Sequence, residues 1–252
     1  MAGTLENKVA IVTGGTSGMG KATSKLFAKE GAKVVIAGIV PQDGADVVAQ
    51  IEADGGEAIY VDADVTKAED VDNLVERAVE AYGGIDILIN NAGYLSSSTM
   101  MDITLDEWNY TWAVNVTGPF YLSKKAIPVM QERGAGSIVN IASIAALESK
   151  FGEVAYTTTK SASLGLTRSI AREFGPTIRA NCIMPGIVMT PMFESEAESP
   201  GGMEFANAVL ETCSLKRFGQ PEDIANVCLF FVSDQSSYMT GQCVRVDGGI
   251  DL

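Results

Sequence analysis

The chain has 252 residues, of which 46% are hydrophobic and 20% charged, the profile of a globular protein with a sizeable core. Its net charge of −14 argues against nucleic acid and anionic membranes as partners. No apolar run reaches the roughly 20 residues of a membrane span. Met1–Lys8 is polar and has no signal-peptide core, so we expect a soluble, cytoplasmic protein.

The cysteines do not indicate a metal centre. Cys182, Cys213, Cys228 and Cys243 are scattered without a C-x-x-C pair, and the chain contains no histidine, which removes the mixed Cys/His zinc sites. We therefore expect buried free thiols and no catalytic metal. Histidine is the usual side chain that titrates near neutral pH, so proton transfer in this chain requires another group.

Short runs rich in valine and isoleucine alternate with helix-length segments along the whole chain. Such runs are typical of strands in a buried parallel sheet; they occur at Lys8–Thr13, Lys33–Ala37, Ala58–Val61, Ile85–Ile89, Ser137–Ile141, Arg179–Ile183 and Cys243–Val246. The alternation predicts an α/β fold, a Rossmann-like doubly wound parallel sheet of about seven strands with helices on both faces. No linker, repeat or change of composition divides residues 1–252, so we expect a single domain.

A glycine-rich segment follows the first predicted strand directly. The sequence TGGTSGMG, residues 13–20, opens a helix expected over Lys21–Glu30. Glycines permit a tight turn and close approach of the backbone to a ligand, and free N–H groups at a helix N-terminus favour a pyrophosphate. This context predicts a dinucleotide site, whereas the alternative is a purely structural turn. The candidate contacts are Thr13, Gly14, Ser17, Gly18, Met19 and Gly20.

The end of the second predicted strand bears on the choice between NAD and NADP. A carboxylate there would hold the ribose diol and an arginine would hold a 2′-phosphate, but residues 37–40 read AGIV. Ser17 adds no positive charge to the glycine turn. An unpaired phosphate dianion is unfavourable on a protein of net charge −14, so Gly38 and Ile39 favour NAD.

Polar residues after the third and fourth predicted strands are further cofactor candidates. Asp64 and Val65 are placed to meet the adenine, although an aspartate there is equally typical of a turn or a helix cap. Asn91, Ala92 and Gly93 follow the fourth strand, at the carboxyl edge where ligands bind in open α/β sheets. We therefore expect both segments to border the dinucleotide.

Asn115 falls within a helix predicted from about Asp106 to Arg133. Asparagine is a poor helix former, so we expect either a local distortion or a functional hydrogen bond at this position. A buried amide with ordinary partners is the alternative.

Tyr156 and Lys160 lie four residues apart, and Ser143 precedes them. A tyrosine normally ionises near pH ~10, which is too high for a base at neutral pH. Residues at i and i+4 share a helical face, so the Lys160 ammonium is expected to lower the pKa of Tyr156 toward the range of efficient acid–base catalysis. Taken alone, the pair is better explained as two residues that merely share a helix.

Residues 190–213 interrupt the alternation of strands and helices. Acidic residues come first, then a Pro-Gly-Gly turn and then apolar residues. The pattern predicts a mobile helical flap with a solvated acidic edge and an apolar inner face, because long insertions in compact domains are often functional. A plain surface insertion is the alternative.

Taken together, these motifs resemble those of the short-chain dehydrogenase/reductase family, in its compact single-domain branch, from about Leu5 to Leu252. The matching residues are, in order, Thr13-Gly-x-x-x-Gly18-x-Gly20, Asn90-Asn-Ala-Gly93, Asn115, Ser143, Tyr156-x-x-x-Lys160, and Pro185-Gly186 followed by Thr190. Thr159 and Ala142 stand where the family often has serine. Gly38 leaves the form of the cofactor open.

The resemblance implies an NAD(P)-dependent oxidoreductase that transfers a hydride between the nicotinamide and a secondary alcohol or ketone. Tyr156 would exchange a proton with the substrate oxygen, and Ser143 would hydrogen-bond the same oxygen. Lys160 would lower the tyrosine pKa and hold the nicotinamide ribose, and Asn115 would support a water chain to Lys160. The nicotinamide end would be held by Pro185, Gly186, Val188 and Thr190.

The residues expected to face the substrate are mostly apolar. They are Ser143 and Tyr156 together with Tyr94, Leu95, Ile144, Ala145, Leu147, Phe151, Met184, Met192, Phe193, Met203 and Phe205. We expect about half of the apolar ones to be ordinary core instead. A pocket with adaptable methionines favours an apolar or alicyclic alcohol or ketone, with steroids among the candidates.

Other functions stay open at this stage. The segment Arg217–Ala225 also resembles 3-oxoacyl-[acyl-carrier-protein] reductases, although the acidic carrier protein would be repelled by a chain of this charge unless Lys124, Lys125, Arg168 and Arg172 form a basic patch. A cofactor-binding regulator is disfavoured by the complete catalytic set, and a sugar epimerase by the missing second domain. The family resemblance further implies a homotetramer with contacts from residues 106–133, 154–174 and the last strand.

Overall fold

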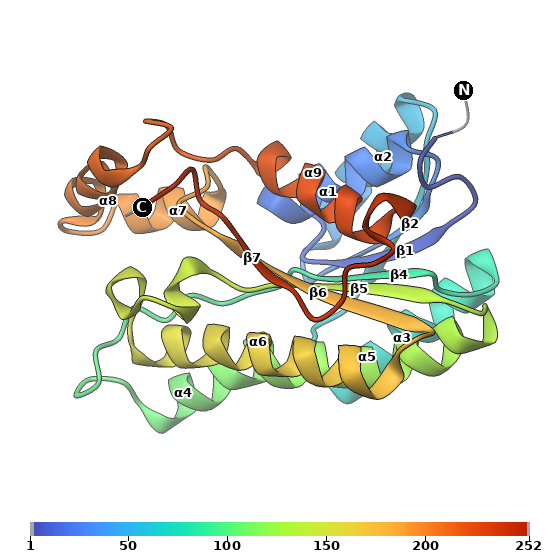
Figure 1. Cartoon of the computed structure of the whole chain (residues 1–252), viewed down its shortest axis with the longest axis horizontal. Coiled ribbons are helices and arrows are strands. Elements are labelled where there is room, and N and C mark those ends of the chain that lie inside the picture. The colour runs from blue at the N-terminus through green and yellow to red at the C-terminus, as the bar shows by residue number, and fades with distance from the viewer. Residues whose placement is uncertain (1–2, 251–252) are drawn as a thin grey trace.

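The computed structural model describes residues 3–250. Seven parallel strands form one sheet in the order β3-β2-β1-β4-β5-β6-β7 (Figure 1). They are β1 (Val9–Thr13), β2 (Lys33–Gly38), β3 (Glu57–Asp62), β4 (Ile87–Asn90), β5 (Gly136–Ile141), β6 (Ile178–Pro185) and β7 (Cys243–Val246). The order reverses beside β1, so the crevice for a ligand is expected at the carboxyl ends of β1 and β4. The predicted doubly wound α/β fold is confirmed.

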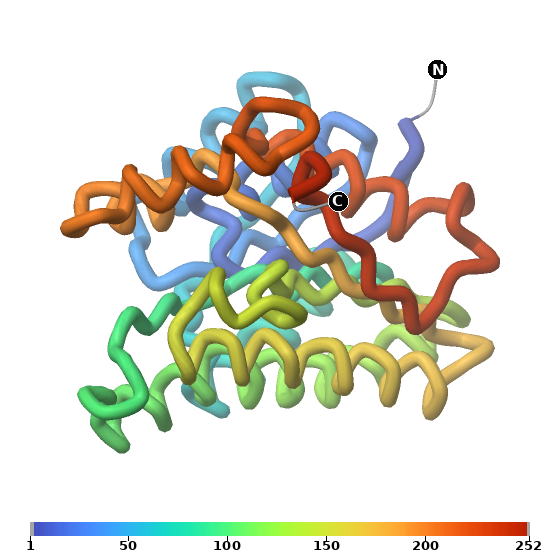
Figure 2. The backbone as a smooth tube through the Cα atoms, turned by 60° about the vertical axis from the view of Figure 1, so that its left-hand side comes forward, coloured from blue at the N-terminus to red at the C-terminus, as the bar shows by residue number. Residues whose placement is uncertain are grey.

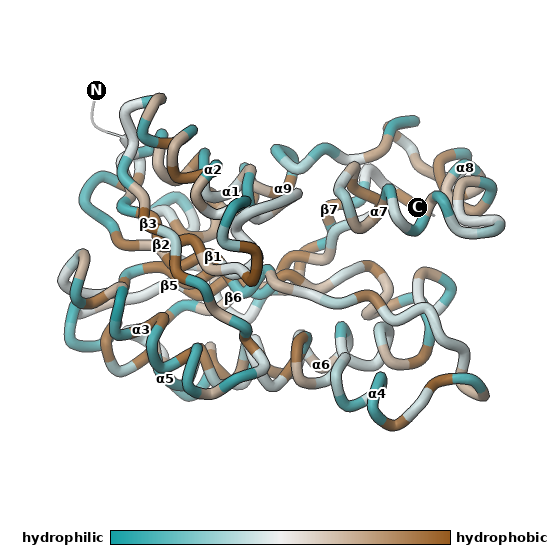
Figure 3. The backbone as a smooth tube through the Cα atoms, turned by 180° about the vertical axis from the view of Figure 1, so that it is seen from behind, coloured by the Kyte–Doolittle hydropathy of each residue, from teal (hydrophilic) through white to brown (hydrophobic). Residues whose placement is uncertain are grey.

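Helices cover both faces of this sheet (Figure 1). One face carries α1 (Gly18–Lys29), α2 (Pro41–Ala53) and α9 (Pro221–Val232), and the other carries α3 (Ala68–Tyr82), α5 (Gly118–Glu132) and α6 (Val154–Phe174). The helix α4 (Leu105–Trp112) precedes α5. Figure 3 shows hydrophobic residues concentrated on the central strands, while outer helical turns and loops are largely hydrophilic.

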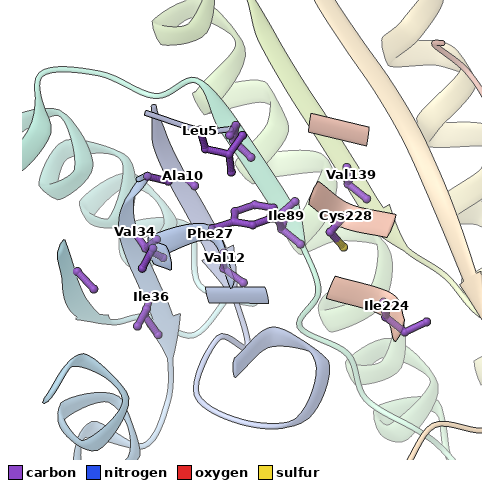
Figure 4. Packing of buried hydrophobic residues seen from close by; sticks show 14 of the residues in the cluster. Leu5, Ala10, Val12, Phe27, Val34, Ile36, Ile89, Val139, Ile224 and Cys228 are labelled. Atoms are coloured by element: carbon purple, nitrogen blue, oxygen red, sulfur yellow. The ribbon is translucent and has the colours of Figure 1, made fainter. Parts of the chain in front are cut away.

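Alternation along the strands divides the core into two layers. Ala10 and Val12 of β1 pack with Phe27 of α1 on one face (Figure 4), and Ile11 between them packs with Leu74 of α3 on the other. All five side chains are fully buried, and burying a large apolar side chain contributes about 1.5–3 kcal/mol. Of the four free cysteines, Cys182, Cys213 and Cys228 are buried and Cys243 is partly buried.

The long helix predicted around Asp106–Arg133 is interrupted. A π-helical turn, Ala113–Thr117, separates α4 from α5. Pro119 lacks the N–H that would continue the regular hydrogen-bond ladder, and Asn115 directs its side chain to other partners, as described below. The distortion expected at Asn115 is therefore confirmed, and the uninterrupted helix is wrong.

The insertion at residues 190–213 holds two helices, α7 (Pro191–Ala197) and α8 (Gly202–Thr212). Figures 1 and 2 show both at one end of the sheet, beyond α9 and across from the N-terminal part of α6. Within residues 3–250, no helix combines the length and apolarity needed to cross a membrane. The same residues contain no group of three or more Cys, Asp or Glu side chains placed to hold a metal ion.

Candidate active site

The glycine-rich turn joins β1 to α1 in a shape that favours glycine. Gly14 (φ 59°) and Gly18 (φ 48°) adopt the left-handed conformation. At Gly20 a Cβ atom would lie 2.1 Å from the Gly14 carbonyl oxygen. Within the described residues, no side chain caps α1 at Ser17 and no acidic residue occupies the first helical turn. The N–H groups at this helix N-terminus therefore suit an anion.

The end of β4 is bonded directly to this turn. Thr13 Oγ1 accepts hydrogen bonds from the backbone N–H groups of Asn91 (3.0 Å) and Ala92 (3.1 Å). Asn91 Nδ2 donates to the carbonyl oxygens of Thr13 (2.9 Å) and Gly14 (3.2 Å). Two segments 77–79 residues apart, both predicted to contact the cofactor, thus form one hydrogen-bonded unit.

Gly38 and Ile39 lie at the carboxyl end of β2, beside the glycine turn. A Cβ atom at Gly38 would lie 2.9 Å from Thr16 Cγ2. Tyr60 Oη donates to the Gly38 carbonyl oxygen at 2.8 Å, and Ile39 is 66% exposed. A side chain at position 38 would therefore contact the Thr16 methyl group in the turn.

Asp64 and Val65 follow β3 and already have partners within the protein. Asp64 Oδ1 accepts from the N–H of Thr66 at 3.0 Å and from its hydroxyl at 2.7 Å. These hydrogen bonds hold the pKa of Asp64 below its usual value, against the opposing effect of burial. Val65 packs against α5, since a Cβ at Gly118 would lie 3.0 Å from the Val65 Cβ. The alternative reading of Asp64 as a turn residue thus matches its contacts.

Asn115 is buried and bonded on three sides. Its Oδ1 accepts from the Tyr94 N–H at 2.8 Å, and its Nδ2 donates to the Tyr94 carbonyl oxygen at 2.9 Å and to Thr159 Oγ1 at 3.1 Å. The amide therefore joins the loop after β4 to α6. Thr159 keeps the hydroxyl of the serine that often occupies this position, and the hydroxyl is used here.

Ser143 and Tyr156 meet beyond the carboxyl end of β5. Ser143 follows β5, and its hydroxyl hydrogen-bonds the Tyr156 phenol and accepts from the Ala145 N–H at 3.1 Å. Tyr156 lies near the start of α6, where a Cβ at Gly152 would come within 2.7 Å of its ring. Gly152 and Ser143 therefore fix the phenol from two directions.

Lys160 lies one turn beyond Tyr156, as the spacing predicted. It is only 5% exposed, and its Nζ donates to the Ile141 carbonyl oxygen at 3.0 Å and sits 5.5 Å from the centroid of the Tyr156 ring. A Cβ at Gly93 would lie 3.4 Å from this Nζ. The ammonium therefore lies near both the loop after β4 and the Tyr156 ring.

The expectation that Lys160 lowers the pKa of Tyr156 is wrong for the protein's own groups. Burial raises the pKa of Tyr156 to about 12, the hydrogen bond from Ser143 opposes this in part, and the charge of Glu196 adds to it. Burial also lowers the pKa of Lys160 to about 8. The ammonium lies over the ring and is directed at Ile141 rather than at the phenol oxygen, so desolvation prevails over the charge.

Both Ser143 and Tyr156 line a cavity of about 400 Å³ between α6, the loops after β4 and β5, and the flap. Its apolar lining includes Leu95, Ile144, Phe151, Met192, Phe193 and Phe205, all predicted to face the substrate. Phe151 and Phe205 meet edge to face with ring centroids 6.3 Å apart. The cavity continues past Met19 to Pro185, Gly186, Val188 and Thr190, the residues predicted at the nicotinamide end.

Five residues predicted at the substrate lie elsewhere. The Tyr94 ring packs on Tyr110, with centroids 5.0 Å apart. Ala145 and Met184 belong to the buried core, whereas Leu147 and Met203 point to solvent. Sequence reasoning missed other lining residues, among them Ser96, Ser97, Lys150, Glu153, Ile187 and Glu196. Of these, only Ser96 and Ser97 carried a signal, because they follow the Asn-Ala-Gly segment.

The glycine-rich turn and the cavity together fit a nicotinamide dinucleotide. The turn offers N–H groups for the pyrophosphate, and a Cβ at Gly18 would come within 3.0 Å of Thr190 Cγ2, so the start of the flap contacts the turn. From there the cavity leads to Ser143 and Tyr156. A dinucleotide held at the turn thus has a path by which its far ring reaches the phenol.

Comparison with known proteins agrees with this geometry. A family model described as enoyl-(acyl carrier protein) reductase matches residues 14–251. The chain is 41% identical over 250 residues to a 3-alpha-(or 20-beta)-hydroxysteroid dehydrogenase of Mycobacterium tuberculosis, covering 99% of this chain and 91% of that one. It is 36% identical over 247 residues to a 3-oxoacyl-[acyl-carrier-protein] reductase of Thermotoga maritima, covering 98% of each.

A solved structure extends the comparison to three dimensions. The structure of a 7α-hydroxysteroid dehydrogenase complexed with NADH and 7-oxo glycochenodeoxycholic acid is similar, with a TM-score of 0.93, 34% identity, and coverage of 98% of this chain and 95% of that one. The human dehydrogenase/reductase SDR family member 4 is 38% identical over 250 residues, 97% of this chain and 88% of that protein. The chain belongs to the short-chain dehydrogenase/reductase family of oxidoreductases.

Proposed function

We propose that the protein is an NAD-dependent dehydrogenase and reductase of apolar, alicyclic secondary alcohols and ketones, with hydroxysteroids and ketosteroids as the first class to test. The observation that carries this proposal is the cavity at Ser143 and Tyr156, whose volume of about 400 Å³ suits a small-molecule ligand. Its aromatic and methionine walls suit rings rather than a charged chain. The hydroxysteroid dehydrogenases among the relatives support the same class.

In the proposed reaction the protein supplies a proton path and a fixed electrostatic environment. NAD, when bound, supplies or accepts the hydride. Tyr156 Oη gives its proton to the ketone oxygen in reduction and takes one from the alcohol in oxidation. Ser143 Oγ donates a hydrogen bond to the same oxygen and stabilises the charge that develops there. The Lys160 ammonium lies 5.5 Å from the centroid of the Tyr156 ring and keeps a positive charge beside it.

Acidic residues of β3 and α2 that lie near the end of β2 support NAD over NADP. Tyr60 stands beside Gly38, and the carboxylates of Asp62 and Asp43 lie near enough to Tyr60 to help raise its pKa to about 12, after the larger effect of burial. A 2′-phosphate at this strand end would add negative charge beside two carboxylates. We expect Asp43→Asn and Asp62→Asn to narrow the preference for NADH, measured as the ratio of dissociation constants for NADPH and NADH. A wild-type protein that prefers NADPH would overturn this part of the proposal.

The test of the proposal is a turnover screen of secondary alcohols and ketones, steroids included, with each nicotinamide cofactor. Tyr156→Phe should abolish turnover and keep cofactor binding, because it removes only the proton-carrying oxygen. Turnover that survives this change would contradict the role of Tyr156. If the wild-type protein binds the cofactor but turns over no substrate, the result would instead favour a cofactor-binding regulator without catalytic activity.

The second candidate is a 3-oxoacyl-[acyl-carrier-protein] reductase, favoured by the full-length match to the Thermotoga protein. The net charge of −14 opposes it, because the carrier protein is itself acidic. A higher kcat/KM for a 3-oxoacyl thioester on carrier protein than for any ketosteroid would reverse the order of the two candidates.

We further propose a cytoplasmic homotetramer with contacts through α4, α5, α6 and β7. Large apolar side chains on α4 and α5 support this assembly: Leu105, Tyr110 and Phe120 are 79%, 46% and 50% exposed. Large apolar side chains that are this exposed are candidates for a contact surface. Light scattering that finds a monomer would remove the assembly.

A further inference from the structure

The flap brings one carboxylate to the catalytic cavity. Helix α7 and the residue that caps its C-terminus carry three glutamates at alternate positions, Glu194, Glu196 and Glu198. Glu196 lines the cavity that also contains Ser143 and Tyr156, whereas Glu194 and Glu198 are not part of its wall. One helix and its C-terminal cap therefore hold a cavity-facing glutamate and two neighbours that serve as matched controls.

Glu196 and Tyr156 line the same cavity. The charge of Glu196 contributes to the raised pKa of Tyr156, and packing around the carboxylate raises the pKa of Glu196 itself, although the residue as a whole lies exposed at the cavity mouth. A ligand in this cavity shares its walls with the Glu196 carboxylate, so the charge of Glu196 acts on the ligand as well.

The other charged residues of the cavity wall are Lys150 and Glu153. Lys150 is held by Glu148, with Nζ 3.5 Å from the carboxylate, and lies over the Phe151 ring at 4.9 Å from its centroid. Glu153, at the N-terminal cap of α6, adds a second negative charge. The cavity wall is thus acidic on balance in an otherwise apolar pocket.

We propose that Glu196 is a specificity-determining residue that makes the catalytic cavity discriminate against anionic substrates in favour of neutral ones. The inference rests on the proposed function and narrows it to neutral ring ketones and alcohols. An anion in the cavity is repelled by the carboxylate of Glu196 because like charges repel, whereas a neutral substrate of the same shape is not. A hydroxyl or amide N–H at this end would instead gain an acceptor.

The test compares one ring skeleton in two charge states. The substrates are 7-oxo glycochenodeoxycholic acid, which carries a carboxylate, and its neutral methyl ester. We expect the wild-type protein to favour the ester by about tenfold or more in kcat/KM, the factor given by about 1.4 kcal/mol of repulsion. Glu196→Gln should reduce this preference by fivefold or more. Glu194→Gln and Glu198→Gln should leave it within twofold of the wild-type value.

Two further measurements separate this inference from the proposed function. Calorimetric dissociation constants for the acid and the ester, measured on all four proteins with cofactor present, report the charge preference even without turnover. Added salt should shrink the wild-type preference more than that of Glu196→Gln, because ions screen a charge effect and not a change of shape. An unchanged preference in Glu196→Gln, or equal changes in the two control variants, would overturn the role of Glu196 whether or not the ketone is reduced.

Discussion

Replacing Lys160 with methionine should change the way in which stability depends on pH. Lys160 is 5% exposed, and burial lowers its pKa from 10.5 to about 8. At 1.36 kcal/mol for each pKa unit, this difference corresponds to about 3.4 kcal/mol. Between the two values the unfolded chain binds more protons than the folded one, so the free energy of unfolding rises with pH across that window. Below pH 8 both states are protonated and the cost of burying the charge is present in full.

The expected change is large enough to measure by urea denaturation. Between pH 7 and pH 10 the titration of Lys160 adds about 2.5 kcal/mol to the free energy of unfolding. Lys160→Met removes this increase. The free energy of unfolding of the variant should exceed that of the wild-type protein by the largest amount at pH 7. Both proteins should carry Tyr156→Phe, because burial raises the pKa of Tyr156 to about 12. The titration of this tyrosine would otherwise lower the free energy of unfolding as pH rises above 10. A single protein concentration keeps any contribution from oligomerisation constant.

An exposed lysine provides the control. Lys124 lies on the surface of α5, and Lys124→Met should leave the difference between pH 7 and pH 10 unchanged. If Lys160→Met shows the same pH dependence as the wild-type protein, Lys160 does not titrate as a buried amine, and the reasoning from desolvation is refuted.

Three further variants probe the site. Ser143→Ala should lower kcat by roughly 10²-fold and move the tyrosine-dependent limb of the pH–rate profile to higher pH, since the Ser143 hydrogen bond lowers the pKa of Tyr156; an unmoved limb would contradict this. Gly152→Ala should reduce kcat with little loss of cofactor affinity, because the new Cβ would come within 2.7 Å of the Tyr156 ring. Gly20→Ala should lower the free energy of unfolding by about 1–3 kcal/mol and weaken cofactor binding.

The order of the elements was predictable because burial on both faces leaves a strong pattern in the sequence. The predicted strand Cys243–Val246 coincides with β7, and the end of α6 at Phe174 was also anticipated. The predicted strand Ile85–Ile89 begins two residues before β4, because Asp86 uses its carboxylate to accept from the Val9 N–H at 2.9 Å and to bind Arg133 at 2.8 Å. Such a side-chain role leaves no trace in hydrophobic periodicity.

The cavity was harder to predict because its wall comes from loops and from one face of a short helix. Apolar residues in such segments are equally suited to the core, to solvent or to a pocket, and Met184, Met203 and Met192 occupy these three places in turn. Glu196 was read as part of a solvated edge, since acidic residues at alternate positions give no sign of which one turns inward. Only the packing of α7 against the rest of the molecule distinguishes it from Glu194.

The helical spacing of Tyr156 and Lys160 predicts that they share a face of the helix. It does not predict whether each side chain is protonated at neutral pH. Burial places the pKa of Lys160 at about 8 and that of Tyr156 at about 12, so the neutral-pH state is an ammonium beside a protonated phenol. A protonated phenol is ready to donate to a ketone oxygen, whereas alcohol oxidation needs the phenol oxygen to accept a proton and gains as pH rises. We therefore expect the pH optimum for ketone reduction to lie below that for alcohol oxidation of the same substrate pair. Initial rates in both directions from pH 6 to pH 10 measure the two optima, and the reverse order would show that other groups set the proton balance of the site.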